Sequence, residues 1–131
     1  MTIDVRPLRV VIADDDPDIR ALVTIAVKRA GLDLVDSCSD GTSAWESLQA
    51  HAPDVAILDV AMPGMTGLEV CRLVRADARL SGIRILMLSA AVADRSRQAG
   101  LVAGADEYFI KPFSPRLLAE RLSLLATGAA R

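Results

Sequence analysis

The chain has very little lysine, few aromatic residues, one histidine and no long hydrophobic run. Lys28 and Lys111 are the only lysines in 131 residues, and aromatic residues make up 3%. No apolar run approaches the roughly 20 residues of a membrane-spanning helix. Residues 1–9 lack the apolar stretch of a signal peptide, and a net charge of -2 does not suggest the basic stripe of a nucleic-acid binder. We therefore expect no membrane span and no direct contact with nucleic acid.

The composition predicts a folded protein of ordinary size. The chain is 52% hydrophobic and 24% charged, which fits a sizeable core with a solvated surface. We expect a single domain over residues 1–131, with its core at about residues 8–126. Cys38 and Cys71 lack the spacing of a metal motif, so a reducing, cytoplasmic setting is the simplest interpretation.

Five short apolar runs alternate with segments of helical periodicity. The predicted strands are residues 8–13, 34–35, 55–58, 83–88 and 108–110, and the predicted helices begin near residues 17, 42, 66, 91 and 115. The fourth helix, expected over 91–102, has the poorest periodicity. Continuous apolar runs are typical of strands buried on both faces, which favours a parallel sheet with helices on each side. Right-handed crossovers then predict a doubly wound α/β fold of five strand–helix units.

Capping signals mark the ends of several predicted helices. Asp16 and Pro17 combine an N-cap carboxylate with a proline at the first helical position, and Gly31 is a stop signal. Thr66 and Glu69 have the spacing of a capping box. We expect Asp16 to act only as a helix cap and not as a metal ligand.

Polar side chains stand at the carboxyl ends of four predicted strands. They are Asp14–Asp16, Asp59, Ser89 and Lys111. Each has an ordinary interpretation by itself: an Asp is commonly a cap or turn former, Ser89 a helix cap and Lys111 a surface lysine. In an open α/β sheet, however, these strand ends meet at one edge, where ligands bind. Their combination therefore predicts a binding site.

The carboxylates at this edge are suited to a magnesium ion. Several carboxylates close together would raise each other's pKa unless a cation were present. Mg²⁺ prefers oxygen ligands, keeps several waters and takes one or two carboxylates. We expect Asp15 and Asp59 to bind Mg²⁺ directly and Asp14 to act through a water molecule.

The same residues predict phosphoryl-transfer chemistry. A carboxylate beside Mg²⁺ can attack a phosphoryl donor and form an acyl phosphate. Such transfer depends mainly on positioning and on neutralising charge. Lys111 can supply a positive charge to one phosphoryl oxygen, and the Ser89 hydroxyl can donate a hydrogen bond to another. Pro112 restricts the backbone after Lys111 and is a candidate for a cis bond.

Four segments that contain these polar residues occur in order along the chain. They are VVIADDDP at 10–17, LDVAMPGMTG at 58–67, LSA at 88–90 and GADEYFIKPF at 104–113. Together they resemble the response-regulator receiver domains of two-component signal transduction, such as the chemotaxis receivers, from about residue 8 to 126. The resemblance implies a flavodoxin-like (βα)5 fold with strand order 2-1-3-4-5. It also implies a phosphoprotein that signals and is not itself an enzyme.

The resemblance assigns a role to each residue of the predicted site. Asp59 would be the phosphoacceptor, taking a phosphoryl group from the phosphohistidine of a sensor histidine kinase or phosphotransfer protein. Asp14 and Asp15 would form the acidic pocket for Mg²⁺, and the backbone carbonyl of Ala61 would be a further ligand. Lys111 would bind the phosphoryl group and precede a cis peptide bond to Pro112.

The resemblance also implies a conformational switch. The Ser89 hydroxyl would move toward phosphorylated Asp59, and Tyr108 would rotate inward into the vacated space. Phosphorylation would thereby bias the surface formed by the fourth helix, the fifth strand and the last helix, which would control an unknown partner or output domain. Glu107 and Arg121 can pair across this surface, and a homodimer through it is one outcome. The alternative to a switching role is that Tyr108 only packs in the core or at the rim.

Two alanines flank the site, and they bear on the competing functions. Ala61 and Ala91 stand where receivers carry polar residues that position water for hydrolysis, so we expect no acceleration of hydrolysis from them. An aspartyl-phosphate phosphatase would need an acid at residue 61. A nucleotide- or flavin-binding domain would need a Gly- or Ser/Thr-rich loop in place of Asp14–Asp16. A flavodoxin-like interaction domain without phosphorylation is disfavoured because every pocket residue is present.

Overall fold

The protein folds into a five-stranded parallel sheet with helices on both faces. A computed structural model describes residues 7–90 and 94–127, and the strand order is β2-β1-β3-β4-β5. The strands are β1 (Arg9–Ala13), β2 (Asp33–Cys38), β3 (Val55–Asp59), β4 (Arg84–Ser89) and β5 (Glu107–Ile110). The helices are α1 (Pro17–Arg29), α2 (Gly41–His51), α3 (Gly67–Ala76), α4 (Asp94–Ala103) and α5 (Pro115–Thr127). This confirms the predicted flavodoxin-like fold and its strand order.

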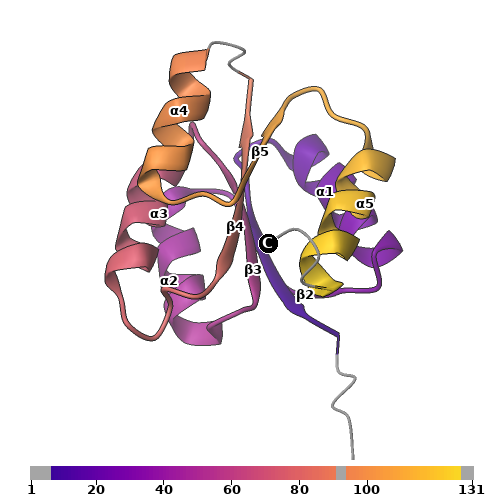
Figure 1. Cartoon of the computed structure of the whole chain (residues 1–131), viewed down its shortest axis with the longest axis horizontal. Coiled ribbons are helices and arrows are strands. Elements are labelled where there is room, and N and C mark those ends of the chain that lie inside the picture. The colour runs from indigo at the N-terminus through magenta and orange to yellow at the C-terminus, as the bar shows by residue number, and fades with distance from the viewer. Residues whose placement is uncertain (1–6, 91–93, 128–131) are drawn as a thin grey trace, which may run out of the picture.

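The sheet separates two hydrophobic cores. Helices α2, α3 and α4 lie on one side of it, and α1 and α5 on the other (Figure 1). Successive side chains of a strand point to opposite faces, so alternate residues of β3 enter alternate cores. Ala56 and Leu58 pack under α2 and α3, whereas Val55 and Ile57 pack under α1 and α5. All four are fully buried, which explains why this strand is a continuous apolar run.

Strand β2 is longer than the predicted residues 34–35. It is an edge strand, and it pairs with β1 from Asp33 to Cys38 with a register shift between Val10 and Val11. Polar residues are tolerated along it because one edge is open. The hydroxyl of Ser47 on α2 donates to Asp36 over 2.6 Å. The apolar run was therefore a poor guide to the length of this strand.

The predicted helix caps are confirmed. Asp16 accepts a hydrogen bond from the Asp18 amide at 2.9 Å, and Pro17 is the first residue of α1. Thr66 and Glu69 exchange both bonds of the capping box at 3.1 Å. These caps fix where α1 and α3 begin, directly after the loops that follow β1 and β3.

The fourth helix is described over Asp94–Ala103, close to the predicted 91–102. Ala91, expected to leave the site without a water-positioning side chain, lies outside the described residues. Within residues 7–90 and 94–127, every helix is too short or too polar to cross a lipid bilayer. Both cysteines are buried, and burial raises the pKa of the Cys38 thiol to about 11, so Cys38 stays protonated at neutral pH.

Candidate functional site

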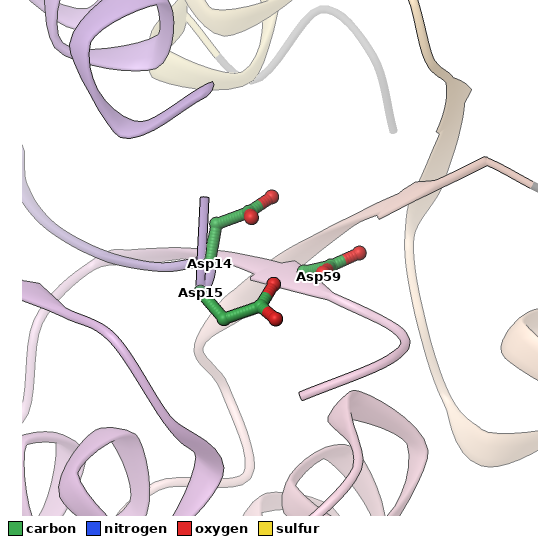
Figure 2. A group of neighbouring side chains, drawn as sticks. All are labelled: Asp14, Asp15 and Asp59. Atoms are coloured by element: carbon green, nitrogen blue, oxygen red, sulfur yellow. The ribbon is translucent and has the colours of Figure 1, made fainter. Parts of the chain in front are cut away.

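Three carboxylates gather at the carboxyl edge of the sheet. Asp14 and Asp15 follow β1, and Asp59 is the last residue of β3. Because Ala13 pairs with Leu58, the residues after each of them lie side by side. Figure 2 shows the three side chains extending to the same side, and one oxygen from each lies within 4.8 Å of the others. Asp14 and Asp59 are 2% and 4% exposed, whereas Asp15 is open to solvent.

Lys111 joins the two buried carboxylates. Its Nζ lies 2.8 Å from Oδ2 of Asp14 and 3.2 Å from Oδ1 of Asp59. The residue directly follows β5, and its backbone amide donates to the carbonyl of Ser89 at 2.7 Å. The peptide bond to Pro112 is cis, as expected. One of the two lysines in the chain is therefore held inside the carboxylate cluster, not on the surface.

The loop after β1 fixes the orientation of Asp14. Oδ1 of Asp14 accepts a hydrogen bond from the Asp16 amide at 2.9 Å. The Arg20 guanidinium, one turn into α1, donates to the backbone carbonyl of Asp14 at 2.7 Å. Oδ2 is thereby turned toward Lys111. It is buried, and apart from this ion pair it has no hydrogen-bond partner among the described residues.

The charges of the pocket act on one another. Burial, and then the negative charge of Asp14, raise the pKa of Asp59 above its ordinary value, while Lys111 opposes this rise. For Lys111, burial alone would lower the pKa. The hydrogen bond to Asp14 and the nearby carboxylate charges outweigh burial and raise the Lys111 pKa above its usual value. The cluster has an excess of negative charge that a cation can neutralise.

The donor set fits a magnesium ion. All three candidate side chains offer oxygen, and the poorly satisfied Oδ2 of Asp14 is a buried acceptor that lacks a full set of donors. Solvent-facing Asp15 leaves room for the waters that Mg²⁺ retains. Ala61 is exposed two residues after Asp59, and its neighbour Val60 is fixed by a bond from its amide to Leu88 O at 2.9 Å. The assignment of each ligand stays a prediction.

Ser89 lies at the end of β4 beside the pocket, whereas Tyr108 lies on β5 against α4. Ser89 ends β4, is 4% exposed and pairs with Ile110. Its strand lies between those that bear Asp59 and Lys111. The half-buried Tyr108 ring lies against Gly100 of α4. The approach is so close that a Cβ on Gly100 would lie 3.2 Å from Cδ2 of the ring. Ser89 is thus placed at the rim and Tyr108 beneath α4, while their roles in a switch stay predictions.

Sequence reasoning missed the residues that act on the site through the backbone. Arg20 donates a hydrogen bond to the backbone carbonyl of Asp14, and the position of Arg20 in a helix gives no sign of this contact. Gly67 begins α3 where a side chain would overlap the carbonyl of Asp59. Gly41 begins α2 where a side chain would overlap Met65, in the loop after Asp59. A glycine at a helix start was the available signal, but it does not say what lies against it.

Fold and site together define a doubly wound α/β domain with a lysine-bridged acidic pocket at the carboxyl edge of its sheet. Residues 10–123 match the family model described as the response regulator receiver domain. The chain belongs to this family. The resemblance of its sequence motifs to receiver domains of two-component signal transduction is thereby confirmed.

Relatives and solved structures agree with this assignment. The DNA-binding response regulator MtrA of Mycolicibacterium smegmatis is 39% identical over 114 residues, covering 87% of this chain and 48% of that protein. The transcriptional regulatory protein GltR of Pseudomonas aeruginosa is 40% identical over 120 residues, covering 92% and 49%. The chain thus spans about half the length of the curated relatives it matches.

Two solved receivers have the same fold. The signal receiver domain of NarL from Mycobacterium tuberculosis superposes with a TM-score of 0.86 at 34% identity, covering 94% of this chain and 98% of that one. The chemotaxis response regulator CheY4 of Vibrio cholerae gives a TM-score of 0.81 at 34% identity, covering 88% and 96%. Each superposition covers nearly the whole of the solved chain, which supports the fold assignment across the described elements.

Proposed function

We propose that the protein accepts a phosphoryl group on Asp59 and holds it as a signal. The donor is the phosphohistidine of a sensor histidine kinase or a phosphotransfer protein. The observation that carries this proposal is the buried Asp59 carboxylate, 3.2 Å from the Lys111 ammonium and grouped with Asp14 and Asp15. A carboxylate placed in this way can act as a nucleophile toward phosphorus.

In the proposed reaction, a carboxylate oxygen of Asp59 forms a bond to phosphorus while the phosphorus–nitrogen bond of the donor breaks. The leaving imidazole takes a proton from solvent. Lys111 neutralises charge on one phosphoryl oxygen, and the Ser89 hydroxyl donates to another. Asp15, Asp59 and the Ala61 carbonyl would hold Mg²⁺ directly and Asp14 would act through a water molecule; the bound ion would supply further positive charge to the phosphoryl oxygens. The protein is changed by this step and does not turn over a substrate.

The proposed output is a change in the surface formed by α4, β5 and α5. Ser89 connects the pocket to this surface, because its carbonyl accepts the Lys111 amide at the end of β5. Tyr108 connects it to α4 through its contact with Gly100. Movement of Ser89 toward the phosphoryl group would free space for Tyr108 and shift the balance between two packed arrangements.

The same surface is proposed to contact a downstream protein, an output domain or a second copy of the chain. Leu117 and Leu124 on α5 are 54% and 42% exposed, and Arg121 pairs with Glu107 at 3.4 Å, as the sequence predicted. MtrA is named a DNA-binding regulator, but we propose no direct nucleic-acid contact for residues 1–131. We propose that residues 1–131 form one receiver domain with its core at about 8–126, and that it acts in the cytoplasm.

Phosphoryl uptake from a small donor tests the proposal. Wild-type protein incubated with acetyl phosphate and Mg²⁺ should gain the mass of one phosphoryl group, and Asp59→Ala should gain none. Uptake by neither protein would refute the proposal, and equal uptake by both would assign the acceptor elsewhere. A phosphatase is less favoured, because Ala61 provides no general acid; such an enzyme would release phosphate continuously from the donor.

A further inference from the structure

The loop after Asp59 is held from outside by the first residues of α2. The Pro63 carbonyl accepts a hydrogen bond from the Gly41 amide at 3.0 Å and another from Met65 at 3.0 Å. Gly41 is the first residue of α2, directly after the capping residue Asp40. The start of one helix and the loop at the acidic pocket are therefore joined, although Pro63 lies 22 positions after Gly41 in the sequence.

The contact is too close for any side chain at residue 41. A Cβ on Gly41 would overlap the carbonyl group of Met65 and lie 2.8 Å from its Cα. Gly41 does not have the positive φ that requires a glycine, and glycine is a poor helix former. The close approach of the loop is thus the physical reason for a glycine here.

A second contact joins the same two segments. Gly64 has a φ of 81°, and a Cβ there would lie 2.6 Å from Oγ1 of Thr42. The loop is also fixed from within: Met62 is 8% exposed in the hydrophobic core, and the Gly67 amide donates to Val60 O at 2.9 Å. Ala61 lies between these fixed points.

We propose that Gly41 is a positioning residue for the metal pocket. By letting α2 touch the backbone of Met65, it holds the 60–66 loop where the Ala61 carbonyl can share a cation with Asp15 and Asp59. This inference rests on the proposed function, since it takes Ala61 as a magnesium ligand. Residues that orient a metal ligand affect affinity without contacting the metal.

The test is the magnesium affinity of Gly41→Ala, measured on folded protein. A titration with MgCl₂, followed by the amide signals of ¹⁵N-labelled protein, reports both folding and binding. The dissociation constant should rise about tenfold. Gly82→Ala is the matched control, because a Cβ there meets nothing within 4 Å, and its affinity should equal that of wild type. A lower unfolding temperature with unchanged magnesium affinity would mean a purely structural role and would overturn the inference.

If Gly41→Ala does not fold, the same magnesium titration is made with Gly64→Ala. The double variant Gly64→Ala/Thr42→Ala keeps the backbone strain at residue 64 and removes the hydroxyl that the new methyl group meets. Weakened magnesium binding in the single variant and partial recovery in the double variant are expected. If Gly64→Ala binds magnesium as tightly as wild type does, the inference is overturned but the proposed function is not. Wild-type protein without magnesium-dependent shifts would overturn the proposed function as well, so the two failures are distinct.

Discussion

The Nζ atom of Lys111 lies 3.2 Å from Oδ1 of Asp59, so a cation from the end of β5 sits beside the carboxylate that ends β3. The side chain of Lys111 is 16% exposed, and that of Asp59 is 6% exposed. A pair buried to this extent is weakly screened by solvent. Lys111 therefore offsets part of the repulsion between Asp59 and Asp14, and it is already in place to meet an incoming phosphoryl oxygen.

Replacing Lys111 should slow phosphoryl uptake. In Lys111→Ala, the transferred group loses a fixed positive charge, and the pKa of Asp59 rises further because the opposing cation is gone. We expect the rate of uptake from acetyl phosphate to fall by roughly 10²-fold, the cost of removing one charge-stabilising donor. Intact-mass measurements over time give the rate.

The other lysine of the chain is the natural control for this variant. Lys28 is exposed on α1 and makes no described contact with the pocket, so Lys28→Ala should phosphorylate at the wild-type rate. Equal rates for the two variants would show that the position of Lys111 does not matter to the transfer.

Magnesium should stabilise the folded protein through the acidic pocket. An ion at about ten times its dissociation constant adds roughly 1.4 kcal/mol to the free energy of unfolding, because it binds the folded state only. Asp15→Asn should lose this gain, because it removes a carboxylate of the proposed magnesium site. The variant should still fold, because Asp15 is exposed and lies outside the core. Calorimetric melts with MgCl₂ and with EDTA measure the difference. Asp18→Asn, an exposed carboxylate on α1 outside the cluster, should keep it.

The sheet was predictable where strands are buried on both faces. Residues 55–58 were recognised because both faces of β3 meet hydrophobic cores, which requires an unbroken apolar run. Strand β2 was underestimated because it lies at an edge and keeps Asp36 and Ser37 beside solvent. Its length is determined by backbone pairing to β1, which leaves little trace in side-chain polarity.

The pocket residues that act through their side chains could be predicted from the sequence. Asp14, Asp59 and Lys111 were found because a parallel sheet gathers the ends of its strands at one edge. Arg20 and Gly41 were missed because one binds a backbone carbonyl and the other acts by having no side chain. Neither role can be derived without knowing which loop lies nearby.

A polar side chain at residue 61 should shorten the lifetime of the phosphorylated protein. Ala61 is exposed two residues after Asp59, and its methyl side chain cannot hydrogen-bond a water that attacks the acyl phosphate. In Ala61→Asn, an amide can orient such a water, and we expect decay to accelerate by about tenfold, less than the roughly 10²-fold or more of a general base. Intact mass after removal of the donor tracks the decay. Ala61→Val adds bulk without polarity, and an equal acceleration by this variant would contradict the explanation.

The hydrogen bond from Ser47 to Asp36 should make stability depend on pH. The Ser47 hydroxyl is the largest cause that lowers the pKa of Asp36 below its ordinary value of 3.8, and partial burial opposes it. A carboxyl group with a lowered pKa in the folded state stabilises the fold above its unfolded pKa. This stabilisation is lost as pH falls through the folded pKa. Ser47→Ala should therefore cost about 1 kcal/mol at pH 7, a modest value because the Asp36 side chain is 42% exposed.

The cost of Ser47→Ala should shrink as pH falls through the lowered pKa that Asp36 has in the folded wild type, because a protonated carboxyl group accepts a weaker hydrogen bond than a carboxylate. Urea unfolding of wild type and variant at pH 7 and at successively lower pH values, down to the acid limit of the folded protein, follows this change. Ser123→Ala on α5 is the matched control, since it is also a helical serine, is exposed, and gains the same helix propensity from alanine. A loss that stays the same across this pH range would contradict the explanation, because the bond from Ser47 should weaken when the Asp36 carboxylate is protonated.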